Sequence, residues 1–364
     1  YNEAIECYDE AGSHNAYAWN DKGLAYEKLE NHKKAIACYD KAIEINPEFG
    51  YPWNNKGNIF FNNSETYKKA IECYDKATKI DDGDDVAWRN MGLAYKKQGN
   101  YKKAIECYDK AIESNAENQN NWMAKGLANY ALKNYDEAIS CYNEVTEIIN
   151  PENRDTWHEA ALAYEKLKNY KKAIECYDKV TKMYPKDSDV WHYKGEAYRY
   201  LENHKKAIEC YDKATKLDPK SEGTWFYKGF VHVDLENHKK AIECYDVVTE
   251  INPKNENAWH NKGFAYTNLK NYKKAIECYD KATKINTKTK NTWFNKGIAY
   301  ENLGEDKKAI SCYDKETYLN PKQERAWQNK GSAYYNLKNY KKAIACYDKA
   351  TKLDPKRENA WFFK

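Results

Sequence analysis

Tryptophan recurs along this chain at an almost constant interval. The eleven tryptophans lie 34 residues apart, with two steps of 35, at positions 19, 53, 88, 122, 157, 191, 225, 259, 293, 327 and 361. Such an interval is typical of arrays in which one small structural unit is repeated and stacked. We therefore divide the chain into ten complete units over residues 16–357. A partial unit, expected to be a second helix and its linker, precedes them at 1–15, and the start of another unit follows at 358–364.

One unit has the pattern of two helices joined by a short turn. In a representative unit the marker residues are Trp259, Gly263, Tyr266, Ala275, Tyr279 and Ala282. The first three of these residues are spaced i, i+4, i+7, and so are the last three. This spacing places each set of three on one face of a helix. A proline ends the second helix in seven of the ten units, and no unit alternates like a strand. We predict an all-α chain with helices at about 16–29 and 32–45, repeated throughout, whose Gly and Ala residues let paired helices pack closely.

Charge and composition exclude several classes of protein. The 60 basic and 56 acidic residues leave a net charge of only +4, whereas disordered chains are usually strongly charged. A nucleic-acid binder would need a basic excess to neutralise phosphates. No apolar run is long enough to span a bilayer. We therefore expect a folded chain, with a core of 34 Tyr, 11 Trp and small residues, that binds neither nucleic acid nor membranes.

The marker residues and the closing proline resemble the tetratricopeptide repeat family, and the resemblance covers essentially the whole chain. It implies an α-solenoid of stacked antiparallel helix pairs, with residues 16–357 as one continuous right-handed superhelix. First helices would line a concave groove, and second helices would form the convex side. Proteins of this family are generally non-enzymatic scaffolds that bind a peptide or protein segment in the groove, and we expect this function here.

The resemblance also implies that residues one, two, five, eight and nine positions after each Trp border the groove. Asparagine two positions after Trp is similar to the asparagine ladder of long arrays in this family, because an amide can pair with both groups of a peptide unit. The alternative is that Asn is simply common there. Units five to seven carry Glu159, Tyr193 and Tyr227 at this position instead, and aromatic residues, which suit binding hot spots, gather around them. We centre the expected site on units six to nine. The candidate groove residues are Asn55, Asn90, His192, Tyr193, Tyr200, Phe226, Tyr227, Phe230, His260, Asn261, Phe264, Phe294, Asn295 and Asn329.

The sequence argues against one specific partner. Co-chaperones of this family hold the acidic tails of Hsp70 and Hsp90 with a two-carboxylate clamp, which requires a Lys directly after the Trp position. Arg89 is the only basic residue at that position, and Leu93 stands where the clamp asparagine should follow. We therefore expect no Hsp70/Hsp90 clamp.

Signatures of catalysis, cofactors and metals are absent from the sequence. His158-Glu159 begins like a zinc-protease motif, but the second His is missing. The eleven cysteines occur once per unit, too far apart for disulfides, so we expect reduced thiols and a cytoplasmic protein. A Lys-Lys pair recurs in nine of ten units. It forms either a basic ridge for an acidic partner or a solvated face balanced by nearby carboxylates, and we favour the second.

Three polar residues break the pattern at positions expected to be buried. Asn129 and His232 replace Tyr, and Glu316 replaces Ala. An unpaired buried polar group costs about 1–3 kcal/mol, so each must find a partner or reach solvent. Neither end of the chain carries the polar cap that a solenoid needs, so we expect a longer array or end-to-end self-stacking. Two alternatives to the scaffold therefore stay open, a docking arm of a larger enzyme and a self-assembling rod.

Overall fold

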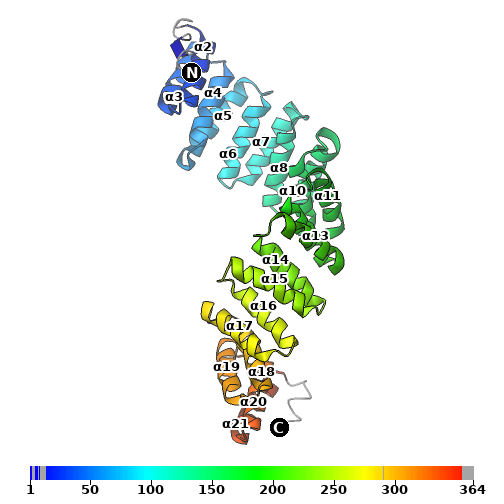
Figure 1. Cartoon of the computed structure of the whole chain (residues 1–364). Coiled ribbons are helices and arrows are strands. Elements are labelled where there is room, and N and C mark those ends of the chain that lie inside the picture. Colours follow the sequence, from blue (N-terminus) through cyan, green and yellow to red (C-terminus); the bar gives the residue numbers. More distant parts are fainter. Residues whose placement is uncertain (2–4, 7, 9–13, 290, 355–364) are drawn as a thin grey trace. The chain divides into compact units, whose positions relative to one another are not determined.

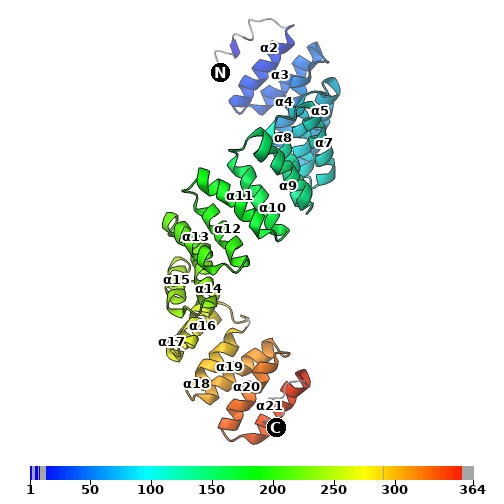
Figure 2. The same cartoon turned by 90° about the vertical axis from the view of Figure 1, so that its right-hand side faces the viewer.

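The computed structural model describes residues 1, 5–6, 8, 14–289 and 291–354, and throughout these residues the regular structure is helical, without a strand. The chain divides into two compact units, Tyr1–Pro185 (unit 1) and Lys186–Lys364 (unit 2). Each unit is a stack of helix pairs (Figures 1 and 2). The predicted all-α solenoid of helix pairs is confirmed, and the first predicted pair is found at Ala16–Lys28 and His32–Ile45.

In both units the even-numbered helices are first helices and the odd-numbered ones are second helices. Unit 1 contains α2 (Ala16–Lys28), α3 (His32–Ile45), α4 (Gly50–Phe61), α5 (Tyr67–Ile80), α6 (Asp85–Lys97), α7 (Tyr101–Ser114), α8 (Gln119–Ala131), α9 (Tyr135–Asn143), α10 (Arg154–Lys166) and α11 (Tyr170–Met183). Unit 2 contains α12 (Ser188–Tyr200), α13 (His204–Leu217), α14 (Glu222–Asp234), α15 (His238–Ile251), α16 (Glu256–Asn268), α17 (Tyr272–Ile285), α18 (Thr292–Asn302), α19 (Asp306–Leu319), α20 (Glu324–Asn336) and α21 (Tyr340–Leu353).

The two 35-residue steps of the tryptophan series are accommodated in different ways, both in unit 1. The first extra residue lies in the turn between α4 and α5, where a short 3₁₀ helix forms at Ser64–Thr66. The second lies at the end of α9, where Glu144–Ile149 forms a π-helix and the N–H of Asn150 bonds to the carbonyl of Val145 at 2.7 Å. A π-helix absorbs one extra residue without ending the helix. Both insertions therefore leave the faces of the flanking helices in register.

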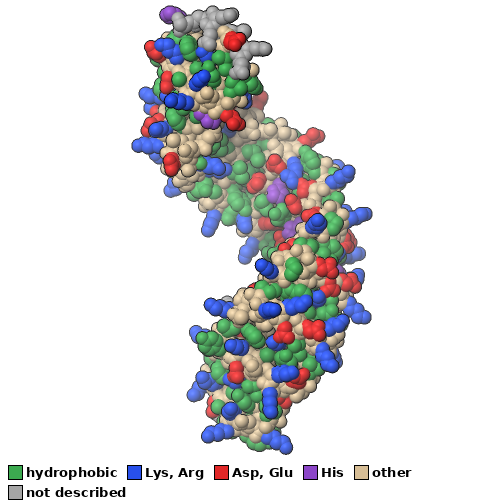
Figure 3. Space-filling model, turned by 60° about the vertical axis from the view of Figure 1, so that its left-hand side comes forward, with side chains coloured by type: hydrophobic (Ala, Val, Ile, Leu, Met, Phe, Trp, Pro, Cys, Tyr) green, Lys and Arg blue, Asp and Glu red, His purple; other side chains and the backbone are tan. Residues whose placement is uncertain are grey.

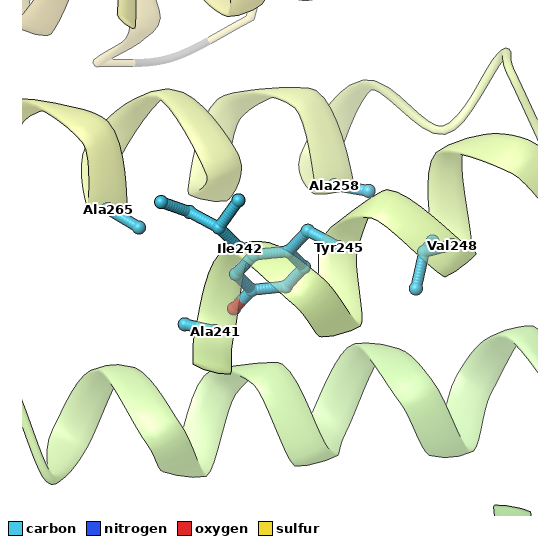
Figure 4. Close-up of a cluster of buried hydrophobic side chains, with 6 residues drawn as sticks. All are labelled: Ala241, Ile242, Tyr245, Val248, Ala258 and Ala265. Carbon is cyan, nitrogen blue, oxygen red and sulfur yellow. The ribbon is translucent and has the colours of Figure 1, made fainter. Parts of the chain in front are cut away.

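A buried tyrosine of the second helix fills the core of each pair. These tyrosines are Tyr39, Tyr74, Tyr108, Tyr142, Tyr177, Tyr211, Tyr245, Tyr279, Tyr313 and Tyr347. The recurring glycine of the first helix makes room for this ring: a Cβ built on Gly263 would lie 2.6 Å from Cε1 of Tyr279. The sequence pattern predicts that glycine lets the two helix backbones approach. In the structure the glycine also leaves the space that the tyrosine ring of the second helix occupies. Figure 4 shows one such core, where Tyr245 lies among Ala241, Ile242, Val248, Ala258 and Ala265.

The tryptophans lie at the edge of this core and fix the turns between pairs. Most are half-buried, and the indole N–H donates to the carbonyl six residues earlier, as from Trp259 to Pro253 at 3.0 Å and from Trp327 to Pro321 at 3.0 Å. The same bond is made in units that lack the proline, as from Trp88 to Asp82 at 2.9 Å. A backbone carbonyl in the linker is thereby satisfied by the marker residue itself.

A lysine three positions after the tryptophan connects neighbouring pairs. Its ammonium lies over the Trp ring, for example at 4.9 Å from the centroid for Lys296 and Trp293, and it pairs with an Asp on the preceding second helix. The pairs are Lys56–Asp40, Lys125–Asp109, Lys228–Asp212, Lys262–Asp246, Lys296–Asp280 and Lys330–Asp314. Met91 and Ala160 take the lysine's place in two units. In these six cases the contact with the ring and the ion pair together orient a helix pair on the one before it.

The three buried polar substitutions have different environments. Asn129 donates to the carbonyl of Lys125 at 3.1 Å and accepts from the Asn134 amide at 3.4 Å. Glu316, fully buried, accepts from the backbone N–H of Phe294 at 3.3 Å and from the Asn320 amide at 2.5 Å. His232 is buried, yet its Nδ1 has no hydrogen-bond partner among the described residues. Asn129 and Glu316 thus find partners, as expected, whereas the Nδ1 atom of His232 neither finds a partner among the described residues nor reaches solvent, which makes His232 the weakest of the three sites.

The cysteines and the chain ends complete the comparison with the sequence. Ten cysteines, all except Cys7, belong to the described residues, and all ten are buried without a disulfide. Burial raises the pKa of the Cys107 thiol to about 12, which keeps it protonated and unreactive. The expected uncapped, self-stacking ends fall mostly on residues 2–4, 7, 9–13 and 355–364, outside the described residues. None of the helices that the structure describes is both long and apolar enough to cross a membrane.

Candidate functional site

A hollow of about 380 Å³ lies in the face of first helices of unit 2. Residues of α14, α15, α16, α18 and α20 and of the turns before α18 and α20 line it. They are Phe230, Val233, Tyr245, His260, Asn261, Phe264, Asn291, Phe294, Asn295, Gln323 and Arg325. Six of the fourteen candidate residues, Phe230, His260, Asn261, Phe264, Phe294 and Asn295, come together here. We refer to this hollow as the unit 2 groove.

An irregular helix start shapes the middle of the unit 2 groove. Most first helices begin after an Asn or Asp side chain that caps them, such as Asn255 before α16. In α18 that cap is missing, the helix begins later, and Asn291 takes a left-handed conformation with φ of 62°. The buried carboxylate of Glu316 replaces the cap by accepting the N–H of Phe294 at 3.3 Å. A carboxylate suits a helix N-terminus because the helix dipole is positive there.

The residues directly after Trp are partly structural. Each ring stacks on the buried tyrosine of its own pair: Phe226 on Tyr245 at 5.8 Å, His260 on Tyr279 at 5.9 Å and Phe294 on Tyr313 at 6.1 Å between centroids. Phe226 also packs against the core cluster of α15 and α16. These side chains are half-buried before any ligand binds. Their truncation would therefore disturb the core as well as the groove.

The residues five positions after Trp are the accessible apolar groups. Phe230 is 39% exposed and Phe264 is 38% exposed, and both line the unit 2 groove. Covering exposed aromatic surface contributes roughly 25 cal/mol per Å² of apolar area. The two phenylalanines are thus the side chains from which a ligand would gain most. From the sequence, the positions one and five after Trp were both expected to border the groove. In the structure, the residues one after Trp pack on the core, whereas those five after Trp are exposed.

A second aromatic cluster surrounds Arg199 on α12. Its guanidinium lies 4.3 Å from the ring centroid of Tyr200, 5.3 Å from Tyr227 and 5.9 Å from Phe230, and 3.6 Å from a carboxylate oxygen of Glu196. Of the candidate residues, Tyr200, Tyr227, His192 and Tyr193 belong to this neighbourhood, and His192 stacks on Tyr227 at 5.8 Å and on Tyr193 at 5.4 Å. Phe230 belongs to both clusters, so apolar surface continues from α12 to the unit 2 groove.

The candidate asparagines do not form one ladder. In unit 1, Asn55 donates to Asn20 at 3.0 Å, and Asn90 donates to Asn54 and Asn58 at 3.1 and 3.2 Å. These amides bond to one another across neighbouring first helices. In unit 2, Asn329 donates to the hydroxyl of Tyr313 at 3.5 Å, while Asn261 and Asn295 line the groove. Only the last two stand beside the exposed phenylalanines.

The histidines of the unit 2 face are neutral, hydrogen-bonded groups. Burial lowers the pKa of His260 below its usual value, and Nδ1 lies 2.7 Å from the Thr292 hydroxyl. Burial also lowers the pKa of His192, against the opposing effect of Glu196, and its Nδ1 lies 3.1 Å from the Thr224 hydroxyl. Among the described residues no cluster of three His, Cys, Asp or Glu side chains is placed to hold a metal ion. The arrangement offers shape, apolar surface and amide groups, which are the means of binding.

The Lys-Lys pairs are largely occupied within their own repeats. The second lysine covers the aromatic ring seven positions after Trp, at 5.5 Å for Lys274 over Tyr266 and 5.2 Å for Lys206 over Tyr198. Lys172 pairs with Glu175 at 3.4 Å. Figure 3 shows basic side chains interspersed with acidic and apolar ones over the face in view. These contacts agree with the expected solvated face.

Four groove residues lie outside the positions expected from the sequence: Tyr245, Asn291, Gln323 and Arg325. Val233, eight positions after Trp225, lies at an expected groove position but is not among the fourteen candidates. Asn291 and Arg325 lie two positions before Trp and Gln323 lies four before it, in the turn and first turn of the helix rather than on the expected face. A signal was available for one of them. Arg325 is the only basic residue at its position in any complete unit.

Comparison with known proteins gives the following likenesses. YrrB, described as a tetratricopeptide repeat protein with an unusual peptide-binding site, is 25% identical, with a TM-score of 0.47, covering 52% of this chain and 97% of its own. MamA is 25% identical, with a TM-score of 0.45, covering 47% and 94%. The Cut9–Hcn1 heterotetramer of the APC/C is 16% identical, with a TM-score of 0.44, covering 96% and 75%. No curated protein sequence matches the chain.

Family profiles match most of the sequence. A profile of subunit 3 of the anaphase-promoting complex matches residues 166–248, and one of the protein prenyltransferase alpha subunit repeat matches 238–269. Profiles of the tetratricopeptide repeat match residues 16–49, 65–99, 86–118, 117–186, 256–287, 291–323 and 324–357. Since these last matches together cover more than half of its length, the chain belongs to the tetratricopeptide repeat family.

Proposed function

We propose that the chain is a non-enzymatic interaction scaffold and that unit 2 binds a peptide or extended protein segment in its groove. The observation that carries the proposal is the hollow of about 380 Å³ in which Phe230 and Phe264 are exposed beside Asn261 and Asn295. Aromatic side chains supply most of the binding energy at protein interfaces. Amides beside them can pair with the N–H and carbonyl groups of a peptide backbone.

The proposal gives the remaining candidates graded roles. His260 and Phe294 form part of the floor of the unit 2 groove, where they pack against the buried tyrosines of their own pairs. Phe226 does not line the groove but packs against Tyr245, which does. Tyr200 and Tyr227 extend the apolar surface toward α12. Asn55 and Asn90 are assigned to stability, because their amides are bonded to other amides. We place the interaction in the cytoplasm, where buried thiols stay reduced.

Selection from a phage-displayed library of random linear peptides, panned against the full chain, tests the proposal. Affinities of the selected peptides are then measured by calorimetry for the chain and for the double variant Phe230→Ala/Phe264→Ala. We expect a loss of roughly 30-fold or more, the equivalent of a hot spot of about 2 kcal/mol.

Leu24→Ala is the matched control. Leu24 occupies the same repeat position in unit 1 and is 37% exposed, so its removal should leave the affinity within about twofold. Peptides that bind the double variant as tightly as the unaltered chain would show that the unit 2 groove is not the binding site. Equal losses in both variants would point to a general effect on the fold.

A further inference from the structure

The charges around the unit 2 groove are one-sided. Among the described residues, Arg325 is the only charged side chain that lines it: burial lowers the pKa of His260 below its usual value, and the other lining groups are apolar, amide or phenolic. No carboxylate of the described residues lines the hollow. The Glu316 carboxylate, which contacts the lining residue Phe294, is buried and accepts hydrogen bonds from the Phe294 N–H and the Asn320 amide. A ligand that brings a negative charge to this end of the groove would be attracted by Arg325.

Arg325 differs from the other described arginines in having no acidic partner. Arg89 pairs with Asp85, Arg154 with Asp155 and Arg199 with Glu196. Within the described part of the chain, Arg325 takes part in no ion pair, and its side chain is exposed on the first turn of α20. The lysines of the repeat framework, in contrast, stack on Trp and pair with Asp. Arg325 is therefore a cation without a structural task in this stack.

The amides next to Arg325 leave one acceptor open. Gln323 donates from Nε2 to Oδ1 of Asn291 at 3.2 Å, while its Oε1 has no hydrogen-bond partner among the described residues. A buried carbonyl oxygen without a donor costs about 1–3 kcal/mol. A peptide N–H would satisfy this oxygen, whereas an inorganic anion would not. The end of the groove formed by Gln323 and Arg325 is therefore best matched by a carboxylate that belongs to a peptide.

We propose that the unit 2 groove selects segments in which a carboxylate accompanies an apolar or aromatic side chain, and that Arg325 is the residue that reads the carboxylate. This inference rests on the proposed function. The apolar side chain covers Phe230 and Phe264 at the α14–α16 end, and the carboxylate pairs with the guanidinium at the α20 end. Two parallel N–H groups of an arginine match the two oxygens of a carboxylate, which gives both strength and orientation.

The same chemistry disfavours a single-stranded nucleic acid as the occupant. Aromatic rings can stack on bases, but a nucleic acid carries a phosphate at every nucleotide and needs several cations along its path. The described residues of the groove supply one, Arg325. The acidic segment needs only the one that is present.

The test uses synthetic peptides with blocked ends, each carrying one Phe and one Asp at varied separations, and their partners with Asn in place of Asp. Binding to the full chain is measured by fluorescence anisotropy. We expect the best Asp peptide to bind about tenfold more tightly than its Asn partner, as for a charge-assisted hydrogen bond. Arg325→Gln should remove this preference while leaving the affinity for the Asn peptide within about twofold. Arg154→Gln, a change of the same type in unit 1, should leave the preference intact.

Further arms separate the sources of charge and the two levels of the proposal. A peptide with Phe and no Asp, bearing a free or an amidated C-terminus, tells a terminal carboxylate from a side-chain one. If Arg325→Gln retains the Asp preference while Phe230→Ala/Phe264→Ala abolishes binding, the role of Arg325 is refuted and the peptide groove stands. If no peptide binds the unaltered chain, or if a labelled single-stranded RNA binds in preference to every peptide, both proposals fail.

Discussion

The two units carry asparagine at the same repeat position and use it differently. In unit 1 the residue directly after Trp is Asn20 or Asn54, and its carbonyl accepts from the asparagine of the next first helix, Asn55 or Asn90. In unit 2 the corresponding residues before Asn261 and Asn329 are Phe226 and Phe294, whose rings stack on core tyrosines and offer no acceptor. The role of an amide on this face is therefore set by the preceding repeat.

The comparison teaches that the frameworks are equivalent and that the difference lies on the surface of the first helices. Tyr108 and Tyr279 are both fully buried, and a Cβ on Gly92 or Gly263 would lie 2.5 or 2.6 Å from the respective ring. At the groove positions, amide pairs in unit 1 are replaced by aromatic residues in unit 2.

Gly92→Val in unit 1 and Gly263→Val in unit 2 should destabilise the chain equally, by about 3 kcal/mol each, the upper end for overpacking a core. The added side chain must displace a buried tyrosine ring in both cases. Urea titrations followed by circular dichroism measure the loss. Gly223→Val is the control, because a Cβ there has nothing within 4 Å. A loss confined to one unit would show that the two frameworks differ after all.

His232 in unit 2 and Asn129 in unit 1 stand where the repeat has a tyrosine. Restoring tyrosine should stabilise the chain more at position 232 than at position 129. His232→Tyr removes a buried nitrogen without a partner, a group that costs about 1–3 kcal/mol, and extends into an adjoining cavity of about 340 Å³. Asn129→Tyr gives up two hydrogen bonds, to Lys125 and from Asn134, so its gain should be smaller. Thermal unfolding of the two variants makes the comparison. A larger gain at Asn129 would mean that its hydrogen bonds contribute nothing.

Sequence reasoning predicted the repeated part of this structure well because the same physical task recurs in every unit. The helix pairs and the buried Ala and Tyr faces follow from spacing alone. The groove was predicted only in part, since several contacts on the face of the first helices join residues far apart in the sequence. Glu316 accepts the N–H of Phe294, 22 residues earlier, and the Asn54–Asn90 bond joins residues 36 apart. The spacing of residues within one helix does not predict contacts between residues so far apart in the sequence.

The amide pairs of unit 1 should show measurable coupling. In a double-mutant cycle of Asn54→Ala and Asn90→Ala, we expect a coupling energy of about 0.5–1.5 kcal/mol, the net contribution of a hydrogen bond. Asn295→Ala in unit 2 should cost less than about 0.5 kcal/mol, because the side chain borders open groove. Urea titration of the four proteins of the cycle and of the Asn295→Ala variant gives both values. Coupling near zero would return Asn90 to the set of candidate binding residues.

The smallest expected effect is the contribution of two unit 2 histidines to stability, which appears only when the pH falls below neutral. Burial lowers the pKa of His260, and burial with the nearby Lys228 and Lys240 lowers the pKa of His232. Because their pKa values are lowered in the folded chain, these histidines bind protons more readily in the unfolded chain. The free energy of unfolding is therefore unaffected above the usual histidine pKa of about 6.5. It falls as the pH drops below that value, until the folded-state pKa is reached. His260→Phe, which introduces the residue found at this position in the neighbouring repeats, and His232→Tyr should each flatten the fall between about pH 7 and pH 5. A pH profile that both variants leave unchanged would mean that these histidines are protonated as readily in the folded chain as in the unfolded one. The neutral, hydrogen-bonded state assigned to the floor of the unit 2 groove would then be wrong.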